Sequence, residues 1–310
     1  MNKLHWIKNL EKEDVQSLIS TVEIFLLDID GVLLRDKTVL PGSDKAVAKL
    51  RSLGKKIGFV TNNSFYPMEV ILKNLKPFEA LEEEILTPNF TFLGYLKKID
   101  FKKDIYMIAC NYPKKLLREA GYNVIDYQDI NPSSLGETAS AISKLSFDAL
   151  DICKNVGIVY LDFDANCQYG SLQVAKILLN YLDDVNFVIG PADNRFPIEN
   201  KMYGIGNQYL VDALLDCTNK TPIRMGKPSQ AAVDLAISKF EITDPSRTLM
   251  VGDNAEIDIV FGARGGFKTL LTLSGVWTKE QVEDWKSSEE SKPDYIAFNM
   301  GELYELIKDM

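Results

Sequence analysis

The N-terminal part of the chain alternates between short apolar runs and a segment with helical spacing. Residues 22–27 (VEIFLL) form an apolar run suited to a strand that is buried on both faces. A helical pattern follows over residues 43–54, where Ser43 can cap the helix and Gly54 can end it. Residues 56–60 (KIGFV) form a second apolar run. Strand, helix and strand in succession predict a βαβ unit, and hence a parallel sheet.

The same alternation returns near the C-terminus and, independently, in the middle of the chain. Further candidate strands lie at residues 247–251, 269–273 and 295–298 and, in the middle, at residues 104–109, 156–163 and 186–189. We therefore predict an α/β fold in which residues 1–87 and 221–310 build one parallel-sheet core. Residues 88–220 are predicted to form a second α/β module inserted into it.

Composition narrows the possible functions. With 46% hydrophobic and 25% charged residues, the chain is an ordinary globular protein. A net charge of −9 without a concentrated basic segment argues against binding to nucleic acid or an anionic membrane. The single histidine, His5, leaves no material for histidine-based zinc sites. Scattered cysteines, no apolar leader and no apolar run of about 18 residues predict a cytoplasmic protein without a membrane span.

Polar side chains follow the predicted strands of the core, at the sheet edge where ligands gather in parallel sheets. They are Asp28, Asp30 and Gly31 after the first strand, Thr61, Asn62 and Asn63 after the second, and Asp253 and Asn254 after the third. Lys227 lies ahead of the third strand in the sequence Met-Gly-Lys-Pro-Ser. We expect these side chains to converge on one crevice.

The three carboxylates predict a divalent cation. Asp28 and Asp30 are two positions apart, so in extended chain their side chains can lean to the same side. Together with Asp253 they would repel one another unless a cation joined them. A hard cation bound through oxygen atoms suits this set, which suggests Mg²⁺.

The remaining groups suit a phosphate. Thr61 and Asn62 offer uncharged donors, Lys227 offers a compact positive charge, and Gly31 leaves room for backbone N–H groups to approach an anion. In the predicted reaction, Asp28 attacks phosphorus and forms an aspartyl-phosphate. Asp30 protonates the leaving alkoxide and then takes a proton from the hydrolytic water.

The motifs resemble those of the haloacid dehalogenase-type phosphatases. The match comprises Asp28-Ile29-Asp30-Gly31-Val32, then Thr61-Asn62-Asn63-Ser64, then Lys227 in Gly-Lys-Pro, then Gly252-Asp253-Asn254 with Asp258. The second motif and the large insert look like the 4-nitrophenylphosphatase branch, which includes phosphoglycolate and pyridoxal phosphatases. The resemblance implies a Rossmann-like core with an inserted α/β cap, Mg²⁺ dependence, and a homodimer formed through the cap. It also places Asn63 at the phosphate, and Asn254 and Asp258 in support of Lys227 or the metal.

Three residues of the inserted module are candidates for substrate contact. Asp193 and Arg195 belong to the stretch at residues 193–200, which is similar to phosphoglycolate phosphatases in particular. Asp164 follows a predicted strand in a second D-x-D pattern, whose alternative interpretation is an ordinary cap loop. An EF-hand is excluded there, because Cys167 occupies the required glycine position.

The leading hypothesis is a phosphatase that acts on small phosphorylated metabolites. One alternative is a dimeric scaffold that binds such metabolites without turnover, motivated by departures from the family pattern at Leu34, at Ile257 and in the short loop at residues 190–193. The other is a phosphotransferase that uses an alcohol as acceptor. The sequence leaves the substrate open among phosphoglycolate, pyridoxal 5′-phosphate, nucleotides, sugar phosphates and prenyl phosphates.

Overall fold

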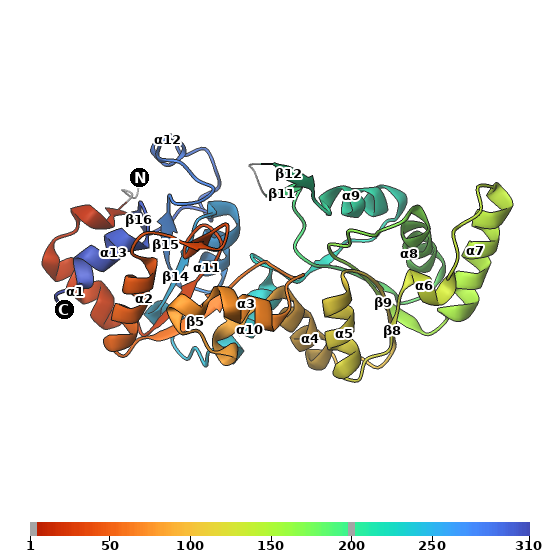
Figure 1. The fold of residues 1–310 in the computed structure, drawn as a ribbon, viewed down its shortest axis with the longest axis horizontal. Helices are drawn as coiled ribbons and strands as arrows, with labels where there is room; N and C mark the ends of the chain where they lie inside the picture. The colour runs from red at the N-terminus through yellow and green to blue at the C-terminus, as the bar shows by residue number, and fades with distance from the viewer. Residues whose placement is uncertain (1–4, 198–201) are drawn as a thin grey trace. The chain divides into compact units, whose positions relative to one another are not determined.

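A computed structural model describes residues 5–197 and 202–310 and divides the chain into two compact units (Figure 1). The core unit comprises Met1–Asn62, Pro67–Thr87 and Lys227–Met310, and the inserted unit comprises Asn63–Tyr66 and Pro88–Gly226. The structure places the end of the inserted unit at Gly226 rather than at residue 220. The reason is a two-residue strand, too short to have a periodicity, that pairs with the inserted sheet.

The core unit is built on a parallel sheet of seven strands in the order β1-β16-β15-β14-β2-β5-β6. The strands are β1 (His5–Trp6), β2 (Ile24–Leu27), β5 (Lys56–Val60), β6 (Ile85–Leu86), β14 (Thr248–Gly252), β15 (Lys268–Thr272) and β16 (Tyr295–Ala297). The interior strand β2 is buried along its whole length, as its unbroken apolar run predicts. A small hairpin, β3 (Leu34–Arg35) and β4 (Thr38–Val39), follows β2.

Helices accompany the sheet of the core unit. They are α1 (Lys12–Thr21), α2 (Ser43–Ser52), α3 (Met68–Asn74), α10 (Gln230–Lys239), α11 (Val260–Arg264), α12 (Lys279–Glu283) and α13 (Met300–Ile307). Helix α2 contacts α13, which in turn contacts α1, whereas α10 packs against α11. Side chains of α10 and α11 share an apolar cluster with Ile24 and Leu26 of β2. Ser43 does not cap α2, because its hydroxyl donates to the carbonyls of Leu33 and Leu40.

The inserted unit has its own parallel sheet of five strands, in the order β13-β10-β9-β7-β8. The strands are β7 (Asp104–Ile108), β8 (Val124–Ile125), β9 (Val156–Leu161), β10 (Asn186–Ile189) and β13 (Ile223–Arg224), with a separate antiparallel hairpin of β11 (Arg195–Pro197) and β12 (Tyr203–Ile205). The helices are α4 (Pro88–Lys98), α5 (Asn111–Glu119), α6 (Tyr127–Ile130), α7 (Ala139–Ile152), α8 (Tyr169–Tyr181) and α9 (Gln208–Cys217). The prediction of an α/β fold with a parallel-sheet core and an α/β insertion is confirmed.

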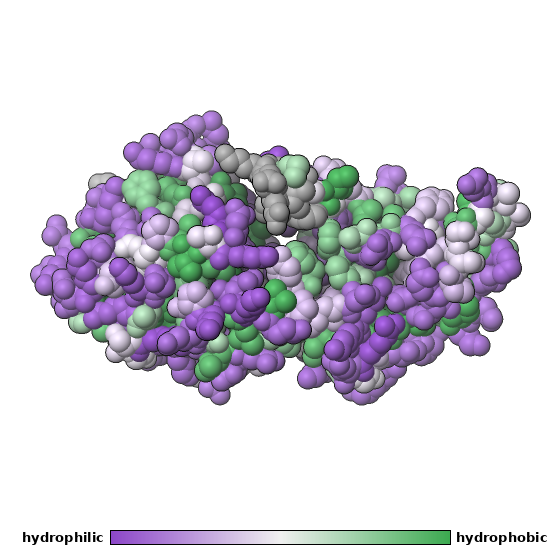
Figure 2. Space-filling view, in the orientation of Figure 1, coloured by the Kyte–Doolittle hydropathy of each residue, from purple (hydrophilic) through white to green (hydrophobic). Residues whose placement is uncertain are grey.

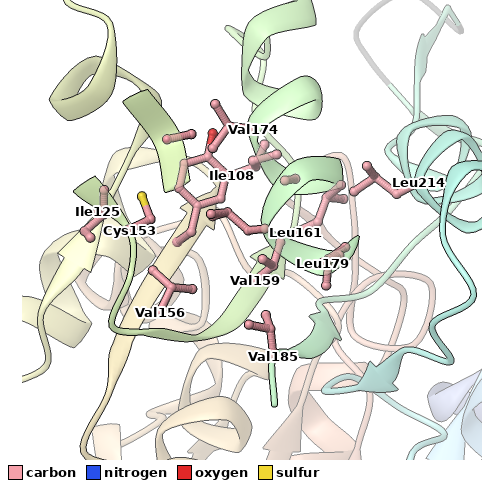
Figure 3. Close-up of a cluster of buried hydrophobic side chains, with 14 of the residues drawn as sticks. Ile108, Ile125, Cys153, Val156, Val159, Leu161, Val174, Leu179, Val185 and Leu214 are labelled. Carbon is pink, nitrogen blue, oxygen red and sulfur yellow. The ribbon is translucent and has the colours of Figure 1, made fainter. Parts of the chain in front are cut away.

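Each unit buries an apolar interior beneath a polar surface. In the inserted unit, Val159 and Leu161 of β9 and Val174 of α8 belong to one buried cluster (Figure 3). The visible faces of both units are mostly hydrophilic, with scattered apolar residues (Figure 2). Within the described part of the chain, no helix has the length and hydropathy needed to cross a membrane.

Candidate active site

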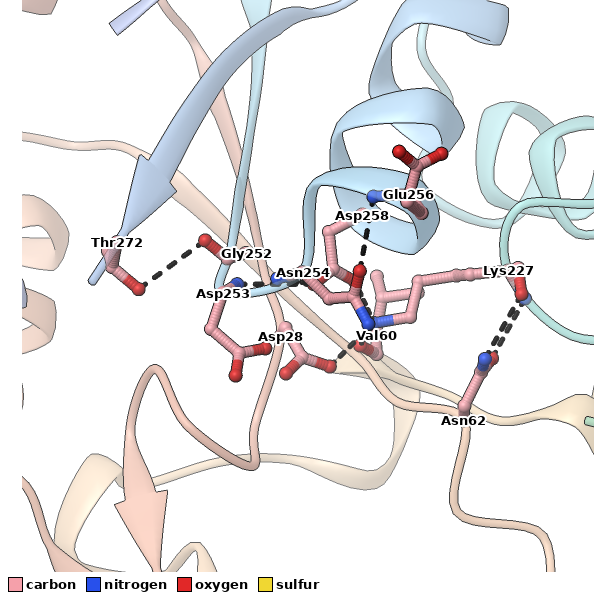
Figure 4. Close-up of polar contacts among 10 residues, drawn as sticks. All are labelled: Asp28, Val60, Asn62, Lys227, Gly252, Asp253, Asn254, Glu256, Asp258 and Thr272. Atoms are coloured by element: carbon pink, nitrogen blue, oxygen red, sulfur yellow. Dashed lines mark hydrogen bonds and ion pairs between the residues drawn. The ribbon is translucent and has the colours of Figure 1, made fainter. Parts of the chain in front are cut away.

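Four of the predicted residues of the core, Asp28, Lys227, Asp253 and Asp258, meet at the carboxyl end of its sheet (Figure 4). Leu27, the last residue of β2, pairs with Phe59 of β5 and with Val251 of β14. This register brings the residues after the three strands to the same level. Asp28 follows directly, and its N–H donates to the carbonyl of Val251 at 2.9 Å.

Lys227 is the centre of the polar network. Its buried ammonium lies 2.5 Å from Asp28 Oδ1 and 2.7 Å from Asp258 Oδ1, and it donates to the carbonyl of Val60 at 2.8 Å. Burial by itself lowers the pKa of this lysine, but the attraction of Asp258 and Asp28 outweighs it and raises the pKa. Lys227 is therefore a fixed cation at the working pH.

Asn62 holds the main chain of Lys227. The N–H of Lys227 donates to Asn62 Oδ1 at 2.8 Å, and Asn62 Nδ2 donates to the carbonyl of Lys227 at 3.1 Å. Asn62 was predicted to bind phosphate. The structure shows both of its polar atoms engaged with the Lys227 backbone, which positions the lysine, and a second N–H remains on Nδ2. The phosphate-binding role of Asn62 remains a prediction.

Three buried carboxylates crowd around that one cation. In the described part of the chain, Asp28, Asp253 and Asp258 form a group whose candidate ligand oxygens all lie within 4.8 Å of one another. Burial is the main cause that raises the pKa of Asp28 well above its usual range, and it raises the pKa of Asp253 to about 7. Three carboxylates against one ammonium leave the protein short of positive charge. A divalent cation with oxygen ligands fits this donor set.

Asp30 stands apart from that group. Strand β2 ends at Leu27, and the chain then turns, so the alternation of an extended strand does not extend to Asp30. Asp28 is buried, whereas the accessible surface of Asp30 is that of an exposed residue. Enough protein surrounds the Asp30 carboxyl that desolvation nevertheless raises its pKa. The structure thus separates a buried carboxylate from one that can exchange protons with solvent.

Gly31 supplies space as well as a turn. Its φ is +91°, and a Cβ at this position would lie 2.3 Å from Asp253 Oδ2. Its own N–H donates to the carbonyl of Leu34 at 2.7 Å. The glycine therefore lets the turn after β2 pass close to Asp253.

Asp258 connects the lysine to the loop after β14. Its Oδ2 accepts from the N–H groups of Asp253 at 3.2 Å and Asn254 at 3.1 Å, while its Oδ1 faces Lys227. Asn254 Oδ1 accepts from the N–H of Glu256 and so caps the turn η5 (Ala255–Ile259). Asp258 thus links the ammonium of Lys227 to the main chain of Asp253, and Asn254 fixes the start of the turn that carries Asp258.

The loop that follows β15 was not predicted from the sequence, yet its residues contact Asp253 and Gly31. The N–H of Val276 donates to Asp253 Oδ2 at 2.8 Å, and a Cβ on Gly275 would lie 1.7 Å from the same oxygen. The hydroxyl of Ser274 donates to the carbonyl of Gly31 at 2.6 Å, and Arg35 donates to the carbonyl of Ser274. The signal was present, because these residues follow the fourth predicted strand at the same sheet edge.

The other predicted residues divide between the units. Thr61 is buried directly after β5, where its N–H donates to the carbonyl of Leu86. Asn63 belongs to the inserted unit, and its Oδ1 accepts from the N–H of Tyr66 at 3.0 Å. The phosphate-binding roles of Thr61 and Asn63 remain predictions.

The candidate substrate residues all lie in the inserted unit. Asp164 Oδ1 accepts from the N–H of Asn166 at 2.9 Å, and Asp193 and Arg195 are exposed. Residues 198–200, part of the stretch that resembles phosphoglycolate phosphatases, lie outside the described residues. Substrate contact by Asp164, Asp193 and Arg195 remains a prediction.

Known proteins resemble this chain over nearly its whole length. A family model described as "Haloacid dehalogenase-like hydrolase" matches residues 25–123, and a second model of the same kind matches residues 224–303. Phosphoglycolate phosphatase 1A of Arabidopsis thaliana is 32% identical over 300 residues, which cover 94% of this chain and 79% of the relative. Glycerol-3-phosphate phosphatase of Homo sapiens is 29% identical and covers 95% of this chain and 94% of its own length.

Solved structures share the fold. The 4-nitrophenylphosphatase of Thermotoga maritima superposes with a TM-score of 0.75 at 25% identity, covering 93% of this chain and 98% of that one. The chain therefore belongs to the haloacid dehalogenase-like hydrolases. Its relatives are phosphatases, and the predicted enzyme class, a phosphoric monoester hydrolase, is confirmed.

Proposed function

We propose that this protein is a Mg²⁺-dependent phosphatase that hydrolyses small-molecule phosphate monoesters through an aspartyl-phosphate on Asp28. The observation that carries the proposal is the setting of Asp28. It is a buried carboxylate held at 2.5 Å by Lys227, next to the further carboxylates of Asp253 and Asp258. Lys227 orients one oxygen of the Asp28 carboxylate, and the other oxygen remains available as the nucleophile.

The metal would be held by Asp28 and Asp253, together with Asp30 as predicted from the sequence, and Asp258 would lie beside them. When bound, Mg²⁺ would neutralise carboxylate and phosphate charge and orient the phosphoryl group. The shortage of positive charge around the three buried acids supports this assignment.

The chain's own residues then account for both chemical steps. In the first, an oxygen of Asp28 forms a bond to phosphorus as the bond to the leaving oxygen breaks, and Asp30 gives its proton to that oxygen. In the second, Asp30 takes a proton from water as the water oxygen bonds to phosphorus and the bond to Asp28 breaks. Lys227 stays charged throughout and stabilises the negative charge on the phosphoryl oxygens.

Named relatives suggest which substrates to examine. Phosphoglycolate, glycerol 3-phosphate and 4-nitrophenyl phosphate occur in their names, and we propose that this chain acts on a small ester of the same kind. A panel that adds pyridoxal 5′-phosphate, nucleotides, sugar phosphates and prenyl phosphates, compared by kcat/KM for released phosphate, identifies the preferred one. Added alcohols in the same assay detect phosphoryl transfer to an acceptor other than water.

Asp28→Asn tests the assignment. We expect it to abolish turnover of 4-nitrophenyl phosphate and to preserve the fold, because Lys227 retains Asp258 as a partner. Asp284→Asn is the matched control, since Asp284 is exposed and pairs only with an exposed lysine at the surface, and it should keep full activity. Unchanged activity in Asp28→Asn rejects the nucleophile. Phosphate binding without turnover in the wild type, with or without Mg²⁺, favours the scaffold.

A further inference from the structure

The chain first leaves the core unit after Asn62 and last returns to it at Lys227. These two crossing points are bonded to each other, because the side chain of Asn62 accepts from the N–H of Lys227 and donates to its carbonyl (Figure 4). The residue before Asn62 is fixed as well, since the N–H of Thr61 donates to the carbonyl of Leu86 at 3.1 Å. The position of the Lys227 main chain therefore depends on what holds the chain on either side of Asn62.

Ser64 anchors the chain just after it enters the inserted unit. It is buried, and other residues of the inserted unit hold both its side chain and its main chain. Its hydroxyl donates to Asp162 Oδ1 at 3.0 Å, and its carbonyl accepts from Asn89 Nδ2 at 2.6 Å. The ring of the next residue, Phe65, lies 5.5 Å from the ring of Phe163 between centroids. The chain is thus fixed again two residues past the crossing point.

Asp162 is a buried carboxylate that the proposed reaction does not use. Its Oδ1 also accepts from the N–H of Phe163 at 2.7 Å, and its Oδ2 accepts from the hydroxyl of Tyr160 at 3.0 Å. Gly190 leaves room for it, since a Cβ there would lie 2.3 Å from Asp162 Oδ2. Burial disfavours the charged form and raises the pKa of Asp162 to about 6. When it is ionised, this carboxylate is a stronger acceptor than a neutral group, which suits it to fixing the hydroxyl of Ser64.

We propose that Asp162 is a positioning residue for the phosphatase reaction. It fixes Ser64, and the short crossing segment carries this constraint to Asn62 and so to Lys227. The segment is bonded at both ends, so a displacement of Ser64 reaches Asn62 across a single intervening residue. A small misplacement of a charged group relative to the reacting atoms lowers the rate strongly. The inference rests on the role in catalysis proposed for Lys227.

Ser64→Ala and Tyr160→Phe form a matched pair of variants. Each removes one hydroxyl that donates to the buried carboxylate of Asp162 at 3.0 Å, but only the Ser64 hydroxyl lies on the route to Asn62. With 4-nitrophenyl phosphate and Mg²⁺, we expect Ser64→Ala to lower kcat about tenfold while KM changes by less than about twofold, because Lys227 acts on the transition state. Tyr160→Phe should destabilise the inserted unit and keep the wild-type kcat.

Two changes at Asp162 itself extend the test. Asp162→Ala removes the acceptor and should reproduce the loss of kcat, and combining it with Ser64→Ala should cause no further loss, because both remove the same contact. Asp162→Asn keeps an oxygen that can accept from Ser64, and its amide can donate to the Tyr160 oxygen. It should therefore retain kcat within about twofold of the wild type. If Asp162→Ala unfolds, the matched pair at Ser64 and Tyr160 decides.

The inference is overturned if Ser64→Ala keeps the wild-type kcat. It is also overturned if Tyr160→Phe loses as much kcat as Ser64→Ala, since the network would then act only through stability. Failure of the proposed mechanism is seen separately, as turnover that survives Asp28→Asn, and it leaves the comparison of the two hydroxyls unchanged.

Discussion

Replacing Lys227 by methionine is expected to destabilise the core unit. At an effective dielectric constant of about 20, the attraction at these separations is roughly 6 kcal/mol for each carboxylate before desolvation is counted. The separations are 2.5 Å to Asp28 and 2.7 Å to Asp258. Removing the ammonium from water cancels a large part of that gain, and loss of one partner from a buried pair costs about 3–5 kcal/mol in practice. We expect a loss of stability in that range for the metal-free protein.

The loss should depend on pH in a defined direction. Without Lys227 the buried acids are opposed by no ammonium, so the pKa values of Asp28 and Asp253 rise further above those of the unfolded chain. The folded state then binds more protons than the unfolded state, and its stability falls as the pH rises. The stability that Lys227→Met loses relative to the wild type should therefore be larger near pH 8 than near pH 5.

Tryptophan fluorescence during urea unfolding measures the free energy of unfolding of the core unit. All three tryptophans, Trp6, Trp277 and Trp285, belong to the core unit. Lys56→Met is the matched control, because Lys56 is exposed and lies 3.7 Å from an exposed glutamate, and it should change stability by no more than about 0.5 kcal/mol. A Lys227→Met protein as stable as the wild type near pH 8 would refute the charge balance described for the site.

Three further changes test other parts of the structure. Gly275→Ala should lower kcat/KM by about 100-fold and raise the Mg²⁺ concentration needed, because its Cβ would displace Asp253; an unchanged Mg²⁺ dependence of activity contradicts this. Ser274→Ala should cost the core unit about 1 kcal/mol by leaving the Gly31 carbonyl without its donor, as tryptophan-detected unfolding can show. Burial raises the pKa of Asp162 to about 6, so ionising it opposes folding, by up to about 3 kcal/mol above that pH. We therefore expect the Asp162→Asn variant to gain hydrogen-exchange protection in β9, relative to the wild type, as the pH rises from about 4 to about 8. A difference between the two proteins that does not change with pH rejects this.

The fold was predictable where the apolar runs are long. The runs at residues 22–27 and 156–163 correspond to interior strands of the two sheets, because strands buried on both faces need unbroken apolar sequence. Strands β6 and β13 have two residues each, and so carry no periodicity that could reveal them. The end of the inserted unit depends on β13, which is why it was placed too early.

The site was predictable where a side chain acts directly after a strand. Asp28 and Asp253 meet as their positions at the sheet edge indicate, whereas Lys227, which follows no strand of the core sheet, was predicted from its residue type and the Gly-Lys-Pro sequence. Pattern alone could not show that Asn62 is engaged with the backbone of Lys227, or that Asp30 leaves the acidic group, because both follow from turns after the strands end. Ser274 and Gly275 act through a hydroxyl contact and through the absence of a side chain, which residue type alone does not reveal.

The most direct test of the mechanism uses Asp30→Asn with 4-nitrophenyl phosphate. Its leaving group departs without a proton, so Asp28 should still be phosphorylated, while hydrolysis of the intermediate lacks its base. Rapid mixing and acid quenching should then give about one equivalent of 4-nitrophenol per site and a phosphoryl group on the peptide that contains Asp28. Steady turnover with neither a burst nor a modified Asp28 peptide would contradict the account.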